Sequence, residues 1–509
     1  MKITAIETHL MQVGARPSGG SSRAADGHGG SRNWLFVKVL TDEGIYGVGE
    51  GSGWPRVVKA AVEDLANVLV GEDPAHVDRL WQRMYVASMG HGTLGTVGGG
   101  AMTAIEMALW DIKGKALGQP VWNLLGGRFR DRVKVYGHAK TPERARELMG
   151  LGVKGVKVGF TGAVDIDRVA AVRDAVGPEV DVMVDAHGPS WMTPADAIQV
   201  GRALEPLDLL FYEDPIAPDN LDGYARIRDA VAIPLAAGER HANIWGLRPL
   251  IERELVDVVQ PDTGRAGGIT QMRKIAAMAE AHYITMAPHS GSLGPVAEFA
   301  ALHVMATIPN ALMLERVEFD WPGRAEVVTP ALRTEDGHLR VPDAPGLGVD
   351  LVLDEITKYP SVRNVATMPE DDGWAYEPGT VAEHLFPDPP RPRPQAAPPG
   401  ILRRRPWPAS SMSPSPRSPS ATRRCSTPWA STSPGASATS SRSGSRAGRS
   451  ASAKPMATRP SCAASKARHR GSSACMCSTS TSSAPGSARQ SPMSPSRTQN
   501  PPPAPARRR

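Results

Sequence analysis

The first 390 residues of this 509-residue chain contain no cysteine, because all four cysteines lie between Cys425 and Cys477. This absence excludes a disulfide-built fold and thiolate metal ligands for that part of the chain. No stretch approaches the ~20 consecutive apolar residues that a membrane span needs. The N-terminus, MKITAIETHLMQV, also lacks the apolar core of a signal peptide. These absences predict a soluble, cytoplasmic protein.

Residues 391–509 contain no aspartate or glutamate, and from Arg403 onward they also lack Leu, Ile, Val, Phe and Tyr. A segment of this composition cannot form a core, so we expect a disordered tail. The tail holds 21 of the 58 Lys and Arg residues, whereas all 52 acidic residues precede it, so residues 1–390 have a net charge of −15. One interpretation is a nucleic-acid-binding tail, because arginine-rich segments neutralise phosphates.

The composition of the tail favours a second interpretation. Its main residues, Ser, Pro, Thr, Ala, Arg and Gly, have C or G as the middle codon base, as expected when a GC-rich gene is read one frame out. With permitted codons, SASAKPMAT (450–458) reads GLGEAYGD in the neighbouring frame, which resembles the chain's own IYGVGEGSG near Ile45. We therefore interpret residues 391–509 as out-of-frame translation.

The first 125 residues predict an α+β unit. The N-terminus alternates polar and apolar residues as a strand does, and residues 33–50 contain two β runs around a DEG turn. Apolar residues at helical spacing follow at 57–70 and 101–118. Between the first two strands lies a loop rich in Gly, Ser and Arg at 15–32, of the kind that often forms a lid or binding loop.

From Val133 the pattern changes to short apolar runs that alternate with amphipathic helical segments. Eight such runs indicate a (β/α)8 barrel, because parallel strands buried on both faces read as continuous apolar stretches. A doubly wound sheet is the alternative, but neither a G-x-G-x-x-G nor a phosphate-loop signature follows any run. The runs are VKVYGH, VKGVKVG, VDVMVDAHG, LLFYEDP, IPLAAGER, VDVVQPD, YITMAPH and ALMLERVE.

Three carboxylates, Asp185, Glu213 and Glu239, end the third, fourth and fifth runs. Barrel enzymes place their chemistry at these strand ends, so we expect the three to meet. Ionised carboxylates repel unless a cation neutralises them, and an all-oxygen set favours a hard ion such as Mg²⁺. A salt bridge or a helix cap is the alternative for any one of them alone. His187 is expected on the same strand face as Asp185. It either lies beside this predicted metal site or is a structural residue that is hydrogen-bonded to nearby backbone.

A carboxylate and an imidazole end the next two runs, at Asp262 and His289. A carboxylate bonded to one ring nitrogen fixes the tautomer and raises the basicity of the other, so the pair predicts a general base. Taken alone, His289 could be structural. Lys157 ends the second run and Glu315 the eighth, which completes a ring of charged side chains.

These features resemble the mandelate racemase group of the enolase superfamily over residues 1 to about 385. The resemblance implies an α+β capping domain at 1–125, completed by about 320–385, and a (β/α)7-8 TIM-type barrel at 126–319. Asp-x-His on the third strand together with a His–Asp pair is most similar to galactonate dehydratase and related acid-sugar dehydratases. The matching stretches are VKGVKVG, VDAHG, FYEDP, PLAAGER, QPDTGRAGGIT, APHSGSLGP and NALMLER.

The resemblance implies removal of the proton α to the carboxylate of an aldonate or aldarate, and loss of the β-hydroxyl as water to give a 2-keto-3-deoxy acid. Lys157 and a protonated Glu315 would assist the enediolate. The racemases have Lys-x-Lys on the second strand, whereas this chain has Gly159 at the second position, so two-base racemisation is not expected. The implied roles are Mg²⁺ ligands for Asp185, Glu213 and Glu239, base for His289 with Asp262, and acid for His187.

Other functions stay open at this point. Within the group they are an epimerase, a mannonate-type dehydratase and a metal-binding homologue without catalysis. The pair of His289 and Asp262 argues against the last, and the acidic charge of residues 1–390 argues against nucleic-acid binding. We expect a homo-oligomer that acts on a small-molecule acid sugar and has no nucleic-acid or membrane partner. Substrate stereochemistry should depend on the 15–32 loop and the 88–100 segment.

Overall fold

A computed structural model describes most of the first 361 residues. The tail, the 15–32 loop and His187 lie outside the described ranges. Those ranges are 1–13, 33–89, 95–160, 165–186, 191–291, 293–318 and 321–361.

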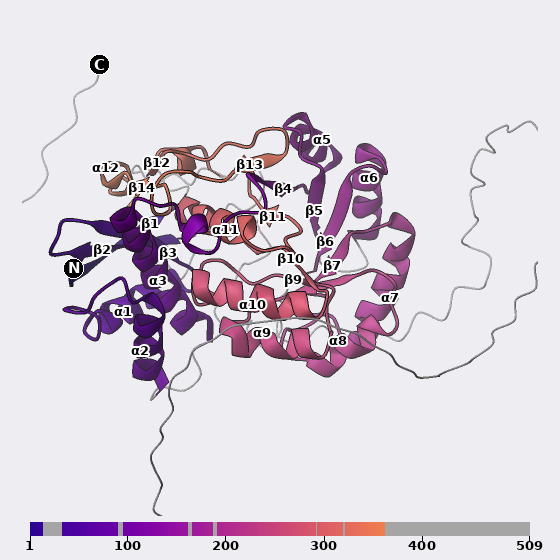
Figure 1. Cartoon of the computed structure of the whole chain (residues 1–509). Helices are drawn as coiled ribbons and strands as arrows, with labels where there is room; N and C mark the ends of the chain where they lie inside the picture. The colour runs from indigo at the N-terminus through magenta and orange to yellow at the C-terminus, as the bar shows by residue number, and fades with distance from the viewer. Residues whose placement is uncertain are drawn as a thin grey trace, which may run out of the picture. The chain divides into compact units, whose positions relative to one another are not determined.

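The N-terminal part is an antiparallel sheet covered by helices (Figure 1). The longest helix packs directly on the third strand, because two glycines there have no side chain. A Cβ at Gly47 or Gly49 would lie 2.0 Å from a carbonyl oxygen of that helix. The elements are β1 (Ile3–Gln12), β2 (Asn33–Thr41), β3 (Tyr46–Gly51), α1 (Pro55–Ala66), α2 (Val77–Met89), α3 (Gly95–Leu117) and α4 (Val121–Leu124).

Eight parallel strands follow in chain order and form a barrel, as predicted. Hydrogen bonds join each strand to the next from β4 to β10, and β11 pairs with β4. The barrel closes where Met286 of β10 bridges Ala311, just before β11. The strands are β4 (Arg132–His138), β5 (Gly155–Gly159), β6 (Asp181–Asp185), β7 (Phe211–Glu213), β8 (Leu235–Ala237), β9 (Val258–Val259), β10 (Thr285–Met286) and β11 (Leu314–Glu315).

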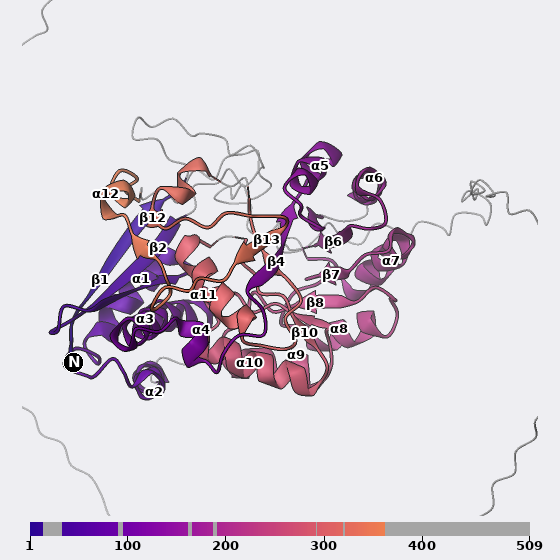
Figure 2. The ribbon, with the colours of Figure 1, turned by 45° about the horizontal axis from the view of Figure 1, so that its top comes forward.

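Helices surround the strands (Figure 2). Two of them begin at a Thr-Pro pair, in which Thr141 or Thr193 accepts a hydrogen bond from a backbone N–H of the first turn and proline occupies the first helical position. Inside the strands, seven side chains from Tyr136 to Met313 form a separate buried cluster, so the barrel is filled rather than open. The helices are α5 (Pro142–Gly150), α6 (Ile166–Val176), α7 (Pro194–Leu204), α8 (Leu221–Arg228), α9 (Asn243–Glu252), α10 (Ile269–Ala281) and α11 (Pro295–Ala306).

After β11 the chain returns to the N-terminal sheet. Trp321 packs edge-to-face on Trp34 at 5.8 Å and on Tyr359 at 4.9 Å between ring centroids, and the N–H of Gln12 donates to the carbonyl of Tyr359. Within the described residues no helix is long and apolar enough to cross a membrane. The elements after β11 are η3 (Pro322–Ala325), β12 (Val328–Thr329), β13 (His338–Arg340), β14 (Asp350–Leu351) and α12 (Leu353–Ile356), of which β13 pairs antiparallel with β4 of the barrel.

A fully buried histidine joins α11 to these returning residues. The N–H of Trp122 donates to Nδ1 of His303 at 3.1 Å, and Nε2 of His303 lies 3.0 Å from the carbonyl oxygen of Leu347. A carbonyl only accepts, so Nε2 carries the proton and the ring is neutral. Burial lowers the pKa of His303 to about 4.

We expect this histidine to make the protein acid-sensitive. Because the pKa of His303 is depressed in the folded state, its contribution to stability is complete above the unfolded pKa near 6.5 and is lost as pH falls towards 4. The loss between pH 7 and pH 5 is about 2 kcal/mol. Urea unfolding at both pH values should show a smaller loss for His303→Gln, and an equal loss in both proteins would contradict the assignment.

Candidate active site

Lys157 of β5 lies among three carboxylates from other strands. It is 1% exposed, and its Nζ is 3.0 Å from Asp185 Oδ2, 3.0 Å from Glu213 Oε2 and 2.6 Å from Glu315 Oε1. Asp185 and Glu213 are opposite each other in the register of β6 and β7, as expected where parallel strands end at one edge. The structure therefore brings four of the predicted residues together at this edge.

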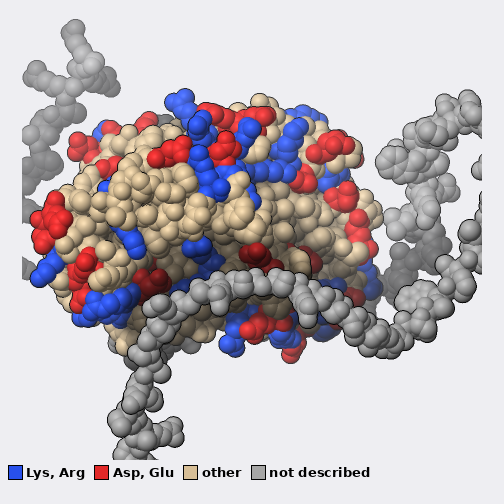
Figure 3. Space-filling model, viewed as in Figure 1, with Lys and Arg blue, Asp and Glu red and all other residues tan. Residues whose placement is uncertain are grey.

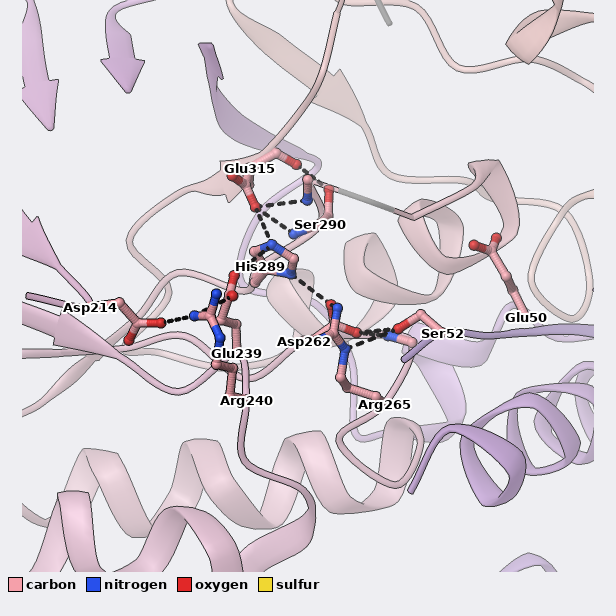
Figure 4. A network of polar contacts seen from close by, with 12 residues as sticks. Glu50, Ser52, Asp214, Glu239, Arg240, Asp262, Arg265, His289, Ser290 and Glu315 are labelled. Carbon is pink, nitrogen blue, oxygen red and sulfur yellow. Dashed lines mark hydrogen bonds and ion pairs between the residues drawn. The ribbon is translucent and has the colours of Figure 1, made fainter. Parts of the chain in front are cut away.

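His289 is the centre of a second group (Figure 4). Its Nδ1 is 2.6 Å from Asp262 Oδ2, and its Nε2 is 2.8 Å from Glu239 Oε2 and 3.7 Å from Glu315 Oε2. Burial opposes protonation, but the negative charges of Glu239 and Glu315 and the bond to Asp262 raise the pKa of His289 well above its ordinary value. In this arrangement both ring nitrogens donate to carboxylates.

The surroundings of Glu315 correct one expectation. Its Oε2 accepts from the backbone N–H groups of Ser290 and Gly291 at 2.7 and 2.8 Å. Burial alone would raise the pKa of Glu315, but the charges of Lys157 and His289 outweigh it and hold that pKa well below its ordinary value. Glu315 is therefore an ionised acceptor here, and not the protonated donor expected from the sequence.

Two residues of this site were not predicted from the sequence. His138 ends β4, and its Nε2 lies 2.6 Å from Glu315 Oε1. Its position at a strand end is the same signal that identified the other residues. Arg240 follows Glu239 directly, contacts its Oε1 at 2.6 Å and also pairs with Asp214. The guanidinium of Arg240 lies 4.8 Å from the ring centroid of Trp191.

The three predicted metal ligands fit a hard divalent cation by their chemistry. Asp185, Glu213 and Glu239 are all buried, and all are oxygen donors. Burial raises the pKa of Glu213 to about 8, and repulsion from Asp185 and Glu239 contributes to the shift, so a bound cation would favour its ionised form. Among the described residues no three such side chains form a ready ligand set, because these carboxylates pair instead with cations such as Lys157 and His289.

The remaining predicted positions differ in what the structure shows. His187 lies outside the described residues. Among the described residues, nothing lies within 4 Å of where a Cβ on Gly159 would be, so none of them fills the position of the racemases' second lysine. Of the two segments expected to select substrate, residues 15–32 and 90–94 are not described, whereas 95–100 belong to α3.

Charges on the outer surface are mixed. On the face seen in Figure 3, Lys and Arg side chains of the described residues are interspersed with Asp and Glu. This mixture is typical of a solvated surface and contrasts with the buried carboxylates of the barrel.

Comparison with known proteins gives two matches to families. Residues 12–126 match the N-terminal domain of the mandelate racemase / muconate lactonizing enzyme family, and residues 140–356 match the enolase C-terminal domain-like family. The chain is 39% identical to D-galactonate dehydratase from Variovorax paradoxus and 36% identical to that from Ralstonia pickettii. Each of these alignments covers 69% of this chain and 96% of the relative.

Comparison with solved structures supports these family matches. The 3,6-anhydro-D-galactonate cycloisomerase from Zobellia galactanivorans is 33% identical with a TM-score of 0.64, over 70% of this chain and 99% of that one. A mandelate racemase/muconate lactonizing enzyme from Jannaschia sp. CCS1 is 33% identical with a TM-score of 0.64, over 72% and 99%.

The capped barrel defines this protein as a member of the enolase superfamily. Within it, the chain belongs to the mandelate racemase group and is close to galactonate dehydratase, which confirms the resemblance seen in the strand-end motifs.

Proposed function

We propose that the protein is an acid-sugar dehydratase, a hydro-lyase that removes the α-proton of an aldonate or aldarate and eliminates the β-hydroxyl as water to give a 2-keto-3-deoxy acid. The observation that carries this proposal is the buried pair of His289 and Asp262 at the same end of the barrel as Lys157 and the carboxylates. The relatives named D-galactonate dehydratase support the same reaction class.

In this proposal Asp185, Glu213 and Glu239 hold Mg²⁺. The bound ion would supply positive charge to the substrate carboxylate as negative charge develops on it. Three buried, mutually repelling oxygen donors at neighbouring strand ends support this assignment.

His289 acts as the base through Nε2. Asp262 accepts from Nδ1 at 2.6 Å, which fixes the ring orientation and leaves Nε2 to take the proton. Nε2 donates to Glu239 in this structure, so that contact must open and Nε2 must lose its proton before a substrate proton can be taken.

Lys157 provides a second positive charge for the substrate carboxylate. Glu315, as an anion, holds the Lys157 ammonium and the His138 ring in place. We assign the general acid that protonates the departing hydroxyl to His187. Gly159 leaves the opposite face without a lysine base, which favours one-sided elimination over racemisation.

The test is a screen of aldonates and aldarates, starting with D-galactonate, for 2-keto-3-deoxy products in the presence of Mg²⁺. We expect product with at least one substrate, and loss of product after chelation or in Asp185→Asn. Product formation by the metal-free protein at the full rate would refute the assigned ligands, and the absence of any product would refute the reaction.

The division of the chain is part of this proposal. We assign residues 1–125, completed by about 320–385, to the cap and residues 126–319 to the barrel. The packing of Trp321 and Tyr359 near Trp34 supports the return of the chain to the cap. We interpret residues 391–509 as out-of-frame translation, which the nucleotide sequence of the gene tests directly.

A further inference from the structure

A residue of the N-terminal part forms a hydrogen bond to the carboxylate of Asp262. Ser52 directly follows β3 of the N-terminal sheet and is 6% exposed. Its hydroxyl donates to Asp262 Oδ1 at 2.8 Å, and its backbone N–H donates to the carbonyl of Gly264 at 2.8 Å (Figure 4). One residue of the N-terminal part thus contacts the segment after β9 through both main chain and side chain.

Arg265 completes the support of this carboxylate. Its Nη2 lies 2.9 Å from Asp262 Oδ2, and its Nε donates to the Ser52 hydroxyl at 3.2 Å. A guanidinium only donates, so the Ser52 oxygen accepts from Arg265 and its single proton is directed at Asp262. Each carboxylate oxygen then has two donors, because the N–H of Gly264 also reaches Oδ1 and His289 Nδ1 reaches Oδ2.

Packing holds the hydroxyl in this position. A Cβ on Gly264 would lie 2.8 Å from Ser52 Oγ and 2.6 Å from a methyl carbon of Leu293. The residue at 264 therefore has to be small for Ser52 to approach Asp262.

Two further contacts tie the same part of the barrel to the N-terminal part. Glu106 of α3 accepts from the N–H groups of Ile269 and Thr270 at the start of α10, at 2.7 and 2.9 Å. Glu50 of β3 accepts in the same way at the start of α11, including a 3.0 Å bond from Ala297. The loop with Asp262 leads into α10, and the loop with His289 leads into α11. By binding the first N–H groups of these helices, Glu106 and Glu50 fix the end of each loop.

We propose that Ser52, together with Arg265, is a positioning residue for the base, and that formation of the working His289–Asp262 pair depends on docking of the N-terminal part onto the barrel. This inference rests on the proposed function. Neither side chain is assigned a contact with substrate, so their loss should affect the proton-removal step rather than substrate binding. A catalytic group misplaced by about 1 Å can lose about 10²-fold in rate, so a smaller displacement of the imidazole should have a smaller effect.

The test compares Ser52→Ala with Thr41→Val in the full-length protein. Thr41 is a matched control, because it is also buried in the N-terminal part and its hydroxyl donates to the nearby carbonyl of Ile45, away from Asp262. We expect Ser52→Ala to lower kcat about tenfold, the size typical of a lost hydrogen bond to a charged group, with KM within about twofold of wild type. Thr41→Val should leave both unchanged.

A second measurement needs no substrate. The Nδ1 proton of His289, assigned in histidine-labelled protein by its loss in His289→Gln, should shift and exchange faster with water in Ser52→Ala and in Arg265→Gln, but not in Thr41→Val. If wild type turns over no acid sugar, the proposed function fails and this proton alone decides the inference. An unchanged proton signal in both variants, or a wild-type kcat in Ser52→Ala, would overturn it.

Discussion

Replacing His289 with glutamine is expected to lower both α-proton exchange and dehydration by about 10²–10⁴-fold, the usual contribution of a general acid or base. Glutamine can still bond to Asp262 and Glu239, but it cannot take up a proton. The measurement is deuterium incorporation at the α-carbon in heavy water, followed together with keto-acid formation. Exchange at the wild-type rate in this variant would place the base elsewhere.

The matched variant is His187→Asn. If His187 is the acid, this variant keeps Lys157, the His289–Asp262 pair and the metal ligands, so it should exchange the α-proton while forming little keto-acid. The two histidines are then separated by role, because the His289 variant loses both signals and the His187 variant only one. Dehydration by His187→Asn at nearly the wild-type rate would leave His187 as a structural neighbour of Asp185.

Replacing Lys157 with methionine is expected to lower the free energy of unfolding by about 3–5 kcal/mol without added metal, because buried carboxylates lose their cation. Methionine keeps a similar volume, so the change is mainly one of charge. Mg²⁺ should restore part of this stability, because an ion that binds the folded state stabilises it. The increase on adding Mg²⁺ should be larger in the variant than in wild type.

Lys134→Met provides the control for this measurement. Lys134 pairs with Asp181 at 2.7 Å, but both side chains are about one-third exposed, and such pairs contribute about 0–1 kcal/mol. Urea unfolding of the three proteins in chelator and in Mg²⁺ gives the comparison. If Mg²⁺ stabilises none of them, Asp185, Glu213 and Glu239 are not its ligands.

The positions of the charged residues at the strand ends can be predicted from the sequence because one physical rule governs them. Parallel strands end at one edge, so Lys157, Asp185 and Glu213 could be placed together from run spacing alone. His138 obeys the same rule at the end of VKVYGH, so its place at the site is also predictable from the sequence.

Other parts of the site have no local signal. Ser52 and Asp262 are 210 residues apart, and their contact depends on how the N-terminal sheet docks onto the barrel. The ionisation of Glu315 depends on the charges of Lys157 and His289, which reach it from other strand ends and which no local residue pattern reveals. Tertiary structure decides both features.

The return of the chain to its own beginning sets an order of events during synthesis. Trp34 is made early but is 1% exposed only once Trp321 and Tyr359 have packed near it, and the barrel closes only when β11 reaches β4. On the ribosome, the N-terminal sheet is therefore synthesised well before Trp321 and Tyr359. Its Trp34 stays without these packing partners until almost the whole barrel has been made. Such a chain exposes an aggregation-prone surface for most of its translation, and chaperones that shield nascent chains would have their main task there.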